Sequence, residues 1–174
     1  MSFHQSKENA TKESEQFDKD SVKEMYINSI RQDKIYPFYT IKKASNSLDK
    51  ESVKEICLAT VQYNSDAIRH IYLSESITDV DMLKEICLAA VQKNGYAIDE
   101  IRQYFPHVID EDMCLIAVKS RPHAIKTVTK CKALGKNSMK KICSEAVRKN
   151  PVTIKLVPDR FITRDFLAQL YLYD

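Results

Sequence analysis

Hydrophobic and polar positions along the chain follow a pattern that returns about every thirty residues. Residues 53–62 return almost unchanged as residues 83–92, and weaker copies begin near Val22, Met113 and Met139. In the best copies the apolar or small residues stand one, three or four positions apart, so each copy predicts an amphipathic α-helix. Repetition with this period is typical of proteins built from stacked helical units.

A shorter apolar segment follows each of these helices, with two apolar residues three positions apart, such as Ile68 and Ile71. That spacing gives a second, short helix one buried face. Asn64, Asn94 and Asn150 stand between the first and second helices. We expect them to end the first helix in the left-handed conformation that asparagine tolerates.

Polar residues mark the predicted starts of the first helices. Ser52 with Glu55 fits a capping box, in which each side chain satisfies a free backbone amide near the other, and Thr78 with Asp81 is a looser version. The acidic residues 110–112 also favour a helix start, because carboxylates interact well with the amides there.

Small residues recur at one position of the first helices, and they would let neighbouring helices approach closely. We predict an all-α chain, a right-handed α-solenoid of about five helix–turn–helix repeats of roughly thirty residues. The small residues are Ser29, Thr60, Ala90, Ala117 and Ala146. The predicted parts are a disordered polar tail over 1–20, units over about 21–50, 51–78, 79–109, 110–136 and 137–162, and a capping helix over 163–174.

Composition agrees with a helical chain and excludes some function classes. Hydrophobic residues make up 44% and charged residues 29% of the chain, and Gly95 and Gly135 are its 2 glycines. A glycine-rich phosphate-binding loop is therefore excluded. No apolar stretch reaches the roughly twenty residues of a membrane span. The first twenty residues lack the apolar core of a secretory signal, and five unpaired cysteines suggest a reducing, cytosol-like compartment.

Four cysteines occupy the same position in successive copies, namely Cys57, Cys87, Cys114 and Cys143. Packed helices stand about 8–10 Å apart, whereas a disulfide needs Cα atoms within about 6.8 Å. Thiols strung along a stack also cannot converge on one zinc ion. We predict that these cysteines pack as small apolar side chains and that the chain has no metal site and no cofactor. Cys131 lies outside the column, and no sequence feature marks its thiol as activated.

Charge is distributed unevenly between the two halves of the repeat region. Residues 51–110 have a net charge of −5 and residues 111–160 a net charge of +8. Like charges four positions apart on a helix are destabilising, so the basic residues have no stabilising role there. We predict that they bind an acidic surface of another protein. The predicted partner-binding residues are Lys126, Lys130, Lys155, Lys119 and Arg121.

Three alternatives stay open for this basic strip. It could bind an anionic membrane surface peripherally, it could bind nucleic acid, or it could be a solvated face without a partner. Nucleic acid ranks below protein because residues 111–160 contain no Phe, Tyr or Trp on which bases could stack. A Cys–His pair formed in space would make the chain an enzyme, but no nucleophile motif is visible.

One block of the sequence resembles a known family. Residues 86–98, with the motif from Ala90 and Val91 to Asn94, Gly95 and the Ala-Ile pair at 97–98, are similar to the bacterial domain-of-unknown-function family numbered 4116. The resemblance is good over residues 83–128. It implies a bacterial helical-repeat protein, often one exported by an intracellular pathogen into host cells, and it supplies no activity. We therefore predict a non-enzymatic protein-interaction module that is cytoplasmic, or else an exported effector or a regulator of one.

Overall fold

The computed structural model describes residues 19–32, 37–74 and 77–171, and within those ranges the chain is helical and contains no strand. The prediction of an all-α chain is confirmed for this part. The predicted tail over residues 1–20 lies outside it, except for Lys19 and Asp20, which begin a helix over residues 19–31.

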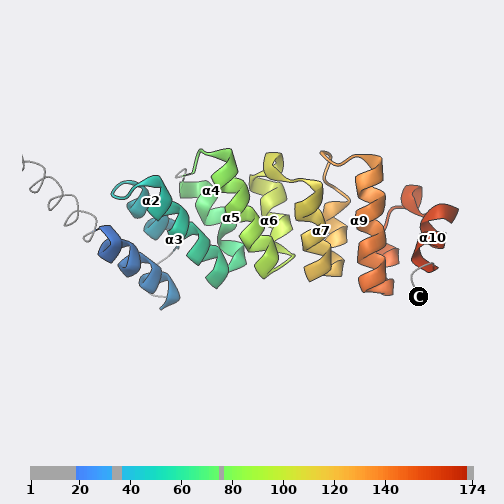
Figure 1. Cartoon of the computed structure of the whole chain (residues 1–174), viewed down its shortest axis with the longest axis horizontal. Helices are drawn as coiled ribbons and strands as arrows, with labels where there is room; N and C mark the ends of the chain where they lie inside the picture. Colours follow the sequence, from blue (N-terminus) through green and yellow to red (C-terminus); the bar gives the residue numbers. More distant parts are fainter. Residues whose placement is uncertain (1–18, 33–36, 75–76, 172–174) are drawn as a thin grey trace, which may run out of the picture.

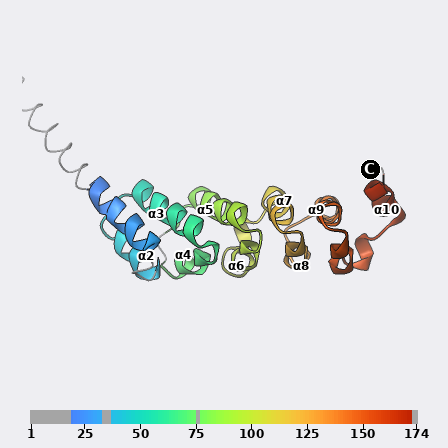
Figure 2. The same ribbon diagram turned by 90° about the horizontal axis from the view of Figure 1, so that it is seen from below.

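Beyond that first helix, the elements lie in two rows that follow the chain order along the long axis of the molecule (Figures 1 and 2). In each row, every element packs against the next one. The first row contains α3 (Lys50–Tyr63), α5 (Val80–Lys93), α7 (Glu111–Ser120), α9 (Lys136–Lys149) and α10 (Arg164–Tyr171). The second row contains α2 (Pro37–Ser45), α4 (Ile68–Ser74), α6 (Ala97–Tyr104), α8 (Ile125–Val128) and the 3₁₀ helix η4 (Pro151–Leu156).

Short 3₁₀ helices directly precede or follow several second-row elements. They are η1 (Ser65–Ala67), η2 (Pro106–Val108), η3 (Pro122–Ala124) and η5 (Asp159–Phe161). In the last unit the predicted short second helix is present as the 3₁₀ helix η4 rather than as an α-helix. Pro151 begins η4, and proline suits the first turn of a helix because the amide it lacks would have no partner there.

The core lies between and within the two rows, and the column of small residues is part of it. Thr60 is 1% exposed, and Ala90, Ala117 and Ala146 are fully buried. The Thr60 hydroxyl donates to the carbonyl one turn earlier at 2.7 Å, which satisfies it inside the core. Small side chains at this position leave room for the neighbouring elements.

Gly95 packs closely against the next helix pair. A Cβ atom on Gly95 would stand 2.3 Å from the backbone oxygen of Ala117 in α7, which no real side chain tolerates. The Gly95 amide donates to the Ser120 hydroxyl at 3.2 Å. Position 95 therefore requires glycine because there is no room for a side chain, and not because of an unusual backbone conformation.

The asparagines between the rows have a different role from the predicted one. Asn64, Asn94 and Asn150 have φ values of −138°, −151° and −150°, so their backbone is extended and the left-handed prediction is wrong. Each side-chain oxygen instead accepts the amide two residues later, at 3.0 to 3.2 Å. The asparagines thus satisfy free amides at the start of the second-row elements.

Helices α3 and α5 begin at aspartates rather than at the predicted Ser52 and Thr78. Asp49 accepts the Ser52 amide at 2.9 Å and is the N-cap of α3. Asp79 accepts two amides at 3.0 Å at the start of α5. The predicted acidic start at residues 110–112 is confirmed, because Asp110 caps α7 by accepting the Met113 amide at 2.8 Å.

Ion pairs link successive first-row helices, and the sequence reasoning did not foresee them. In the early pairs a lysine of one helix binds an acid of the next helix. Glu111 and Lys141 occupy the repeat positions of Lys54 and Glu55 with the charges exchanged, so the last pair is reversed in sign. The pairs are Lys23–Glu55 at 2.8 Å, Lys54–Glu85 at 2.8 Å, Lys84–Asp110 at 2.6 Å and Glu111–Lys141 at 2.7 Å. Three of these four pairs join residues of the same half of the repeat region, so they leave its charge asymmetry unchanged.

Candidate functional site

The predicted basic strip is exposed, but it does not form one helical face. Lys126 lies on α8 and Lys155 on η4, and both side chains are exposed. The helix α8 ends at Val128, and Lys130 lies in the turn that follows it. The prediction that Lys126 and Lys130 share a regular helical face is therefore wrong.

Lys119 and Arg121 lie at the end of α7, apart from the other three residues. Arg121 follows α7 beside Gly95. Lys119 lines a cavity of about 780 Å³ between α7, α9 and α10. Two of its basic residues form ion pairs, Lys141 with Glu111 and Arg148 with Glu145, so part of its positive charge is neutralised. The lining residues are Leu115, Lys119, Asn137, Lys140, Lys141, Ser144, Glu145, Arg148 and Asp165.

Three further cavities lie where the second row connects back to the first row. These connections run along the upper edge of Figure 1. We name them the Lys50 cavity, the Tyr72 cavity and the Cys131 cavity. Ile77 and Thr78 line both the Lys50 and the Tyr72 cavities, and His107 lines both the Tyr72 and the Cys131 cavities. The three cavities therefore follow one another, and we call them together the edge groove.

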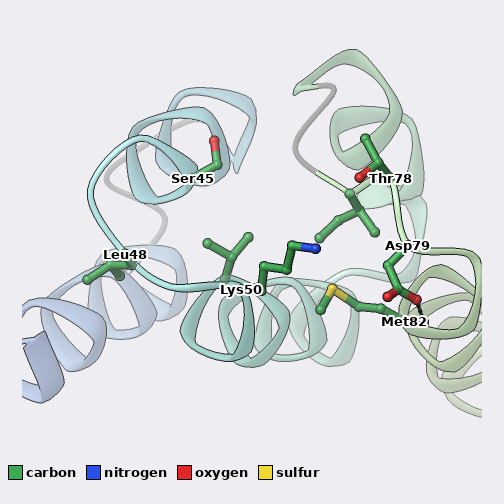
Figure 3. Close-up of a pocket in the computed structure, with 8 residues that line it drawn as sticks. Ser45, Leu48, Lys50, Thr78, Asp79 and Met82 are labelled. Atoms are coloured by element: carbon green, nitrogen blue, oxygen red, sulfur yellow. Dashed lines mark hydrogen bonds between the residues drawn. The ribbon is translucent and has the colours of Figure 1, made fainter.

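The Lys50 cavity is the smallest of the three, at about 60 Å³. Figure 3 shows Lys50 extending from the start of α3 with its amino group toward Thr78, while Asp79 and Met82 approach from α5. A cavity needs about 10–15 Å³ of such volume to hold a water molecule, so this one has room for water. The lining is Ser45, Leu48, Lys50, Val53, Ile77, Thr78, Asp79 and Met82.

The Tyr72 cavity is aromatic and has a volume of about 400 Å³. The Tyr72 ring is 47% exposed, and its centroid lies 5.1 Å from that of Tyr104 and 5.5 Å from that of Phe105. Tilted rings at these distances form a stable apolar wall. The lining is Ile71, Tyr72, Ile77, Thr78, Val80, Leu83, Tyr104, Phe105 and His107. Such a cavity suits an aromatic or aliphatic side chain.

The Cys131 cavity is cationic and has a volume of about 460 Å³. Arg102, Lys130 and Lys132 form no ion pair with any residue in the part of the chain that the structure describes. The Nε atom of Arg102 is buried and finds no hydrogen-bond partner there either. The lining is Arg102, Pro106, His107, Ile109, Lys130, Cys131, Lys132 and Ala133. An unpaired cationic cavity suits a carboxylate.

The four cysteines of the repeat column are fully buried, as predicted. Burial raises the pKa of the Cys57 and Cys87 thiols to about 12 and that of Cys143 to about 11. These thiols therefore stay protonated near neutral pH and act as packing groups. The pKa of the Cys114 thiol is raised as well, by its interaction with Cys131 and by burial.

Two kinds of site are missing from the described ranges. No group of three His, Cys, Asp or Glu side chains there could hold a metal ion. Over the same residues, no helix combines the length and the apolar character that crossing a membrane requires.

Sequence reasoning found Lys130 but missed the rest of the edge groove. Tyr72 and Tyr104 meet across two helix pairs although they stand at different repeat positions, so comparing equivalent positions could not find them. The sequence contained one indication of the aromatic cavity, because aromatic residues stand near the ends of the second-row helices. Their meeting depends on how successive pairs pack.

Comparison with known proteins adds no relative to this picture. No family model matches the chain, and neither the curated proteins nor the solved structures contain a match. The resemblance seen around residues 83–128 therefore stays a prediction, and the geometry of the edge groove is the basis for assigning a function.

Proposed function

We propose that this chain is a non-enzymatic protein-binding module, an α-solenoid of about five helix–turn–helix repeats whose edge groove receives an extended segment of another protein. Two rows of helices, each packed on the next in chain order, support this architecture. Stacks of this kind present long surfaces with one equivalent position per layer. The observation that carries the proposal is that an aromatic cavity and a cationic cavity are neighbours, because His107 lines both of them.

The spacing of the cavities suggests the conformation of the bound segment. Neighbouring helix axes stand about 8–10 Å apart, so equivalent cavities recur at about that interval. A polyproline II segment has three residues per turn and rises about 3.1 Å per residue. Its side chains therefore face the same way about every 9 Å. A segment in this conformation would place residues three positions apart into neighbouring cavities.

The chemistry of the cavities suggests the side chains of the partner. The Tyr72 cavity would take an aromatic or aliphatic side chain, because its wall is built of rings. The Cys131 cavity would take a carboxylate, because Arg102, Lys130 and Lys132 line it. We infer a partner segment with an apolar and an acidic residue three positions apart.

The other predicted binding residues have a lesser part in this proposal. Lys126 and Lys155 are exposed on the second row and would attract an acidic partner without contacting the groove. Lys119 and Arg121 lie at the end of α7, away from the groove. An exported bacterial effector, or a regulator of one, is the setting that the family resemblance implies, and it is a hypothesis about origin rather than about the site.

The test uses an array of fluorescent proline-rich peptides in which a phenylalanine and a glutamate stand two to five positions apart. Fluorescence polarisation with the full chain should give the tightest binding at a spacing of three. Replacing the glutamate by glutamine should weaken binding. Tyr72→Ala, and Lys130→Glu combined with Lys132→Glu, should each weaken binding about tenfold, which corresponds to about 1.4 kcal/mol.

Matched variants outside the groove serve as controls. Tyr96 is 45% exposed, close to the value for Tyr72, so Tyr96→Ala removes a similar ring without touching the groove. Lys93→Glu combined with Lys149→Glu repeats the charge change elsewhere on the surface. The proposal would be contradicted if the groove and control variants lost the same peptide affinity, or if the peptides bound equally well at every spacing.

The electrostatic alternatives predict a different result. Duplex DNA and vesicles containing phosphatidylserine would be tested with the same chain at low and high salt. Binding to either that falls steeply with salt, together with no binding of the peptide array, would favour an electrostatic surface for nucleic acid or membrane.

A further inference from the structure

The edge opposite the edge groove is formed where first-row helices end and second-row elements begin. In Figure 1 the helices α5, α7 and α9 end along the lower side of the molecule. The joints there carry exposed cations together with an exposed tyrosine and an exposed valine. We name this surface the basic edge, and its residues are Lys93, Tyr96, Lys119, Arg121, Lys149 and Val152. Lys126 and Lys155 lie about one turn further along the second row.

The positive charge of the basic edge is not neutralised within the described part of the chain. Its lysines and its arginine form no ion pair with any residue there. Glu145 is the one acidic residue among residues 113–158, and it already pairs with Arg148 at 2.8 Å. Asp99 holds the repeat position of Lys126 in the unit before and accepts the hydroxyl of Thr127.

The apolar side chains of the basic edge stand in solvent beside these cations. Tyr96 is 45% exposed and Val152 is 61% exposed, and they hold the same repeat position as the exposed His123. Neither Tyr96 nor Val152 lines any of the cavities described above. Cations in the last turn of a helix interact favourably with its dipole. That role explains the lysines at the helix ends but not the apolar side chains beside them.

We propose that the basic edge binds peripherally to the surface of a membrane that contains anionic phospholipids. Lysine and arginine are attracted to the negative surface of such a membrane. Tyrosine and valine gain by entering the region between the headgroups and the acyl chains, where the tyrosine hydroxyl stays hydrated. An edge with both kinds of side chain therefore matches both features of an anionic lipid surface.

A lipid surface explains this edge better than a nucleic acid does. Single strands bind where bases stack on aromatic rings that are set among cations. Tyr96 is the one Phe, Tyr or Trp of the basic edge, and residues 111–160 contain none. The cations at the ends of α7 and α9 therefore have no ring beside them from their own units, whereas an apolar side chain such as Val152 suits lipid.

The position of the basic edge leaves the edge groove accessible. The helices α5 and α9 have 14 residues each and are about 21 Å long, and the two surfaces lie at their opposite ends. A membrane against the basic edge therefore faces away from the edge groove, so vesicles and peptide can bind at the same time. The membrane proposal does not depend on the proposed peptide binding.

The first test measures sedimentation of the full chain with phosphatidylcholine vesicles in which about a third of the lipid is phosphatidylserine. The chain should bind these vesicles, should stay in solution with pure phosphatidylcholine, and should bind more weakly as salt is added. Lys93→Glu combined with Lys149→Glu should reduce the affinity at least about tenfold. No binding to the anionic vesicles would overturn the proposal, and binding of single-stranded oligouridine in its place would make the edge a nucleic-acid surface.

The matched control reverses two charges on the opposite edge. Lys130→Glu combined with Lys132→Glu makes the same change in net charge within the Cys131 cavity. At physiological salt, charges in water are screened beyond about 8 Å, so this variant should keep most of its affinity for the vesicles. If both double variants lost the same affinity, the basic edge would not be the binding site. Circular dichroism checks that each variant is folded.

The second test measures whether Val152 enters the lipid. The chain contains no tryptophan, so Val152→Trp introduces a single fluorescent reporter. On the anionic vesicles its emission should shift to shorter wavelength, and lipids that carry a spin label on the upper acyl chain should quench it. Val80→Trp is the control, because Val80 is 54% exposed at the start of α5 and lines the edge groove. An unchanged Val152→Trp spectrum in the bound chain, or an equal shift for Val80→Trp, would overturn the proposal.

Discussion

At the scale of single residues, the 2 glycines of the chain meet different surroundings. Gly95 faces the backbone of α7, where an added Cβ would stand 2.3 Å from the Ala117 oxygen. We predict that Gly95→Ala destabilises the chain by about 1–3 kcal/mol, because the two helix pairs must move apart to admit the methyl group. The measurement is the free energy of unfolding in urea, followed by circular dichroism.

Gly135 gives the matched control for this substitution. An added Cβ there meets no atom within 4 Å, and its backbone angles suit any residue. Gly135→Ala should therefore change the free energy of unfolding by less than about 1 kcal/mol, with the gain in chain stiffness opposed by a poorer N-cap. If both variants lost the same stability, close packing at Gly95 would not be the cause.

At the scale of elements, helix ends depend on hydrogen bonds that single side chains make. Asp79 accepts the amides of Asp81 and Met82, whereas Thr78, the residue predicted to cap α5, is exposed and makes no capping bond. Asp79→Ala should cost about 1 kcal/mol in the free energy of unfolding, and Thr78→Ala should cost much less. Chemical denaturation of the two variants and of the unchanged chain shows which residue caps α5. A larger loss of unfolding free energy in Thr78→Ala than in Asp79→Ala would show that Thr78 is the cap, as the sequence predicted.

The helices themselves were predictable because burial imposes a period on the sequence. In the copies from residue 53 onward, the positions of Ile56, Cys57, Thr60 and Val61 hold apolar or small residues because that face is covered, and the structure buries all four of these residues. The ends were less predictable because adjacent polar residues compete for the same amides. A threonine and an aspartate at neighbouring positions can both cap a helix, and the one that does so depends on how the chain enters α5.

The candidate site was predictable only in part. Lys130 was identified from charge, which is visible in any sequence. Tyr72 and Tyr104 belong to different helix pairs and meet only once the pairs are stacked. Cys131 lines the cationic cavity because it lies in the turn after α8, and no spacing in the sequence encodes that position. Residues brought together by packing between layers are the ones that sequence periodicity misses.

At the scale of the whole molecule, the order of the helices along one axis has consequences for stability. In a stack, stability is roughly the sum of contributions from units and from the interfaces between neighbours, so damage at one end stays near that end. The helix α10 packs against α9, and its Phe166 is 2% exposed. This end therefore tests whether the chain behaves as a stack.

We predict that Phe166→Ala acts locally. Removing a buried ring of this kind costs about 3–5 kcal/mol where the surroundings cannot relax, and the last helix of a stack can separate instead. Amide hydrogen exchange should become about tenfold faster in α10 and the facing part of α9, while the amides of α3 and α5 keep their protection. An equal loss of protection in all helices would show that the chain unfolds as a single cooperative core. The proposed peptide binding depends on a layered surface, so that result would also count against it.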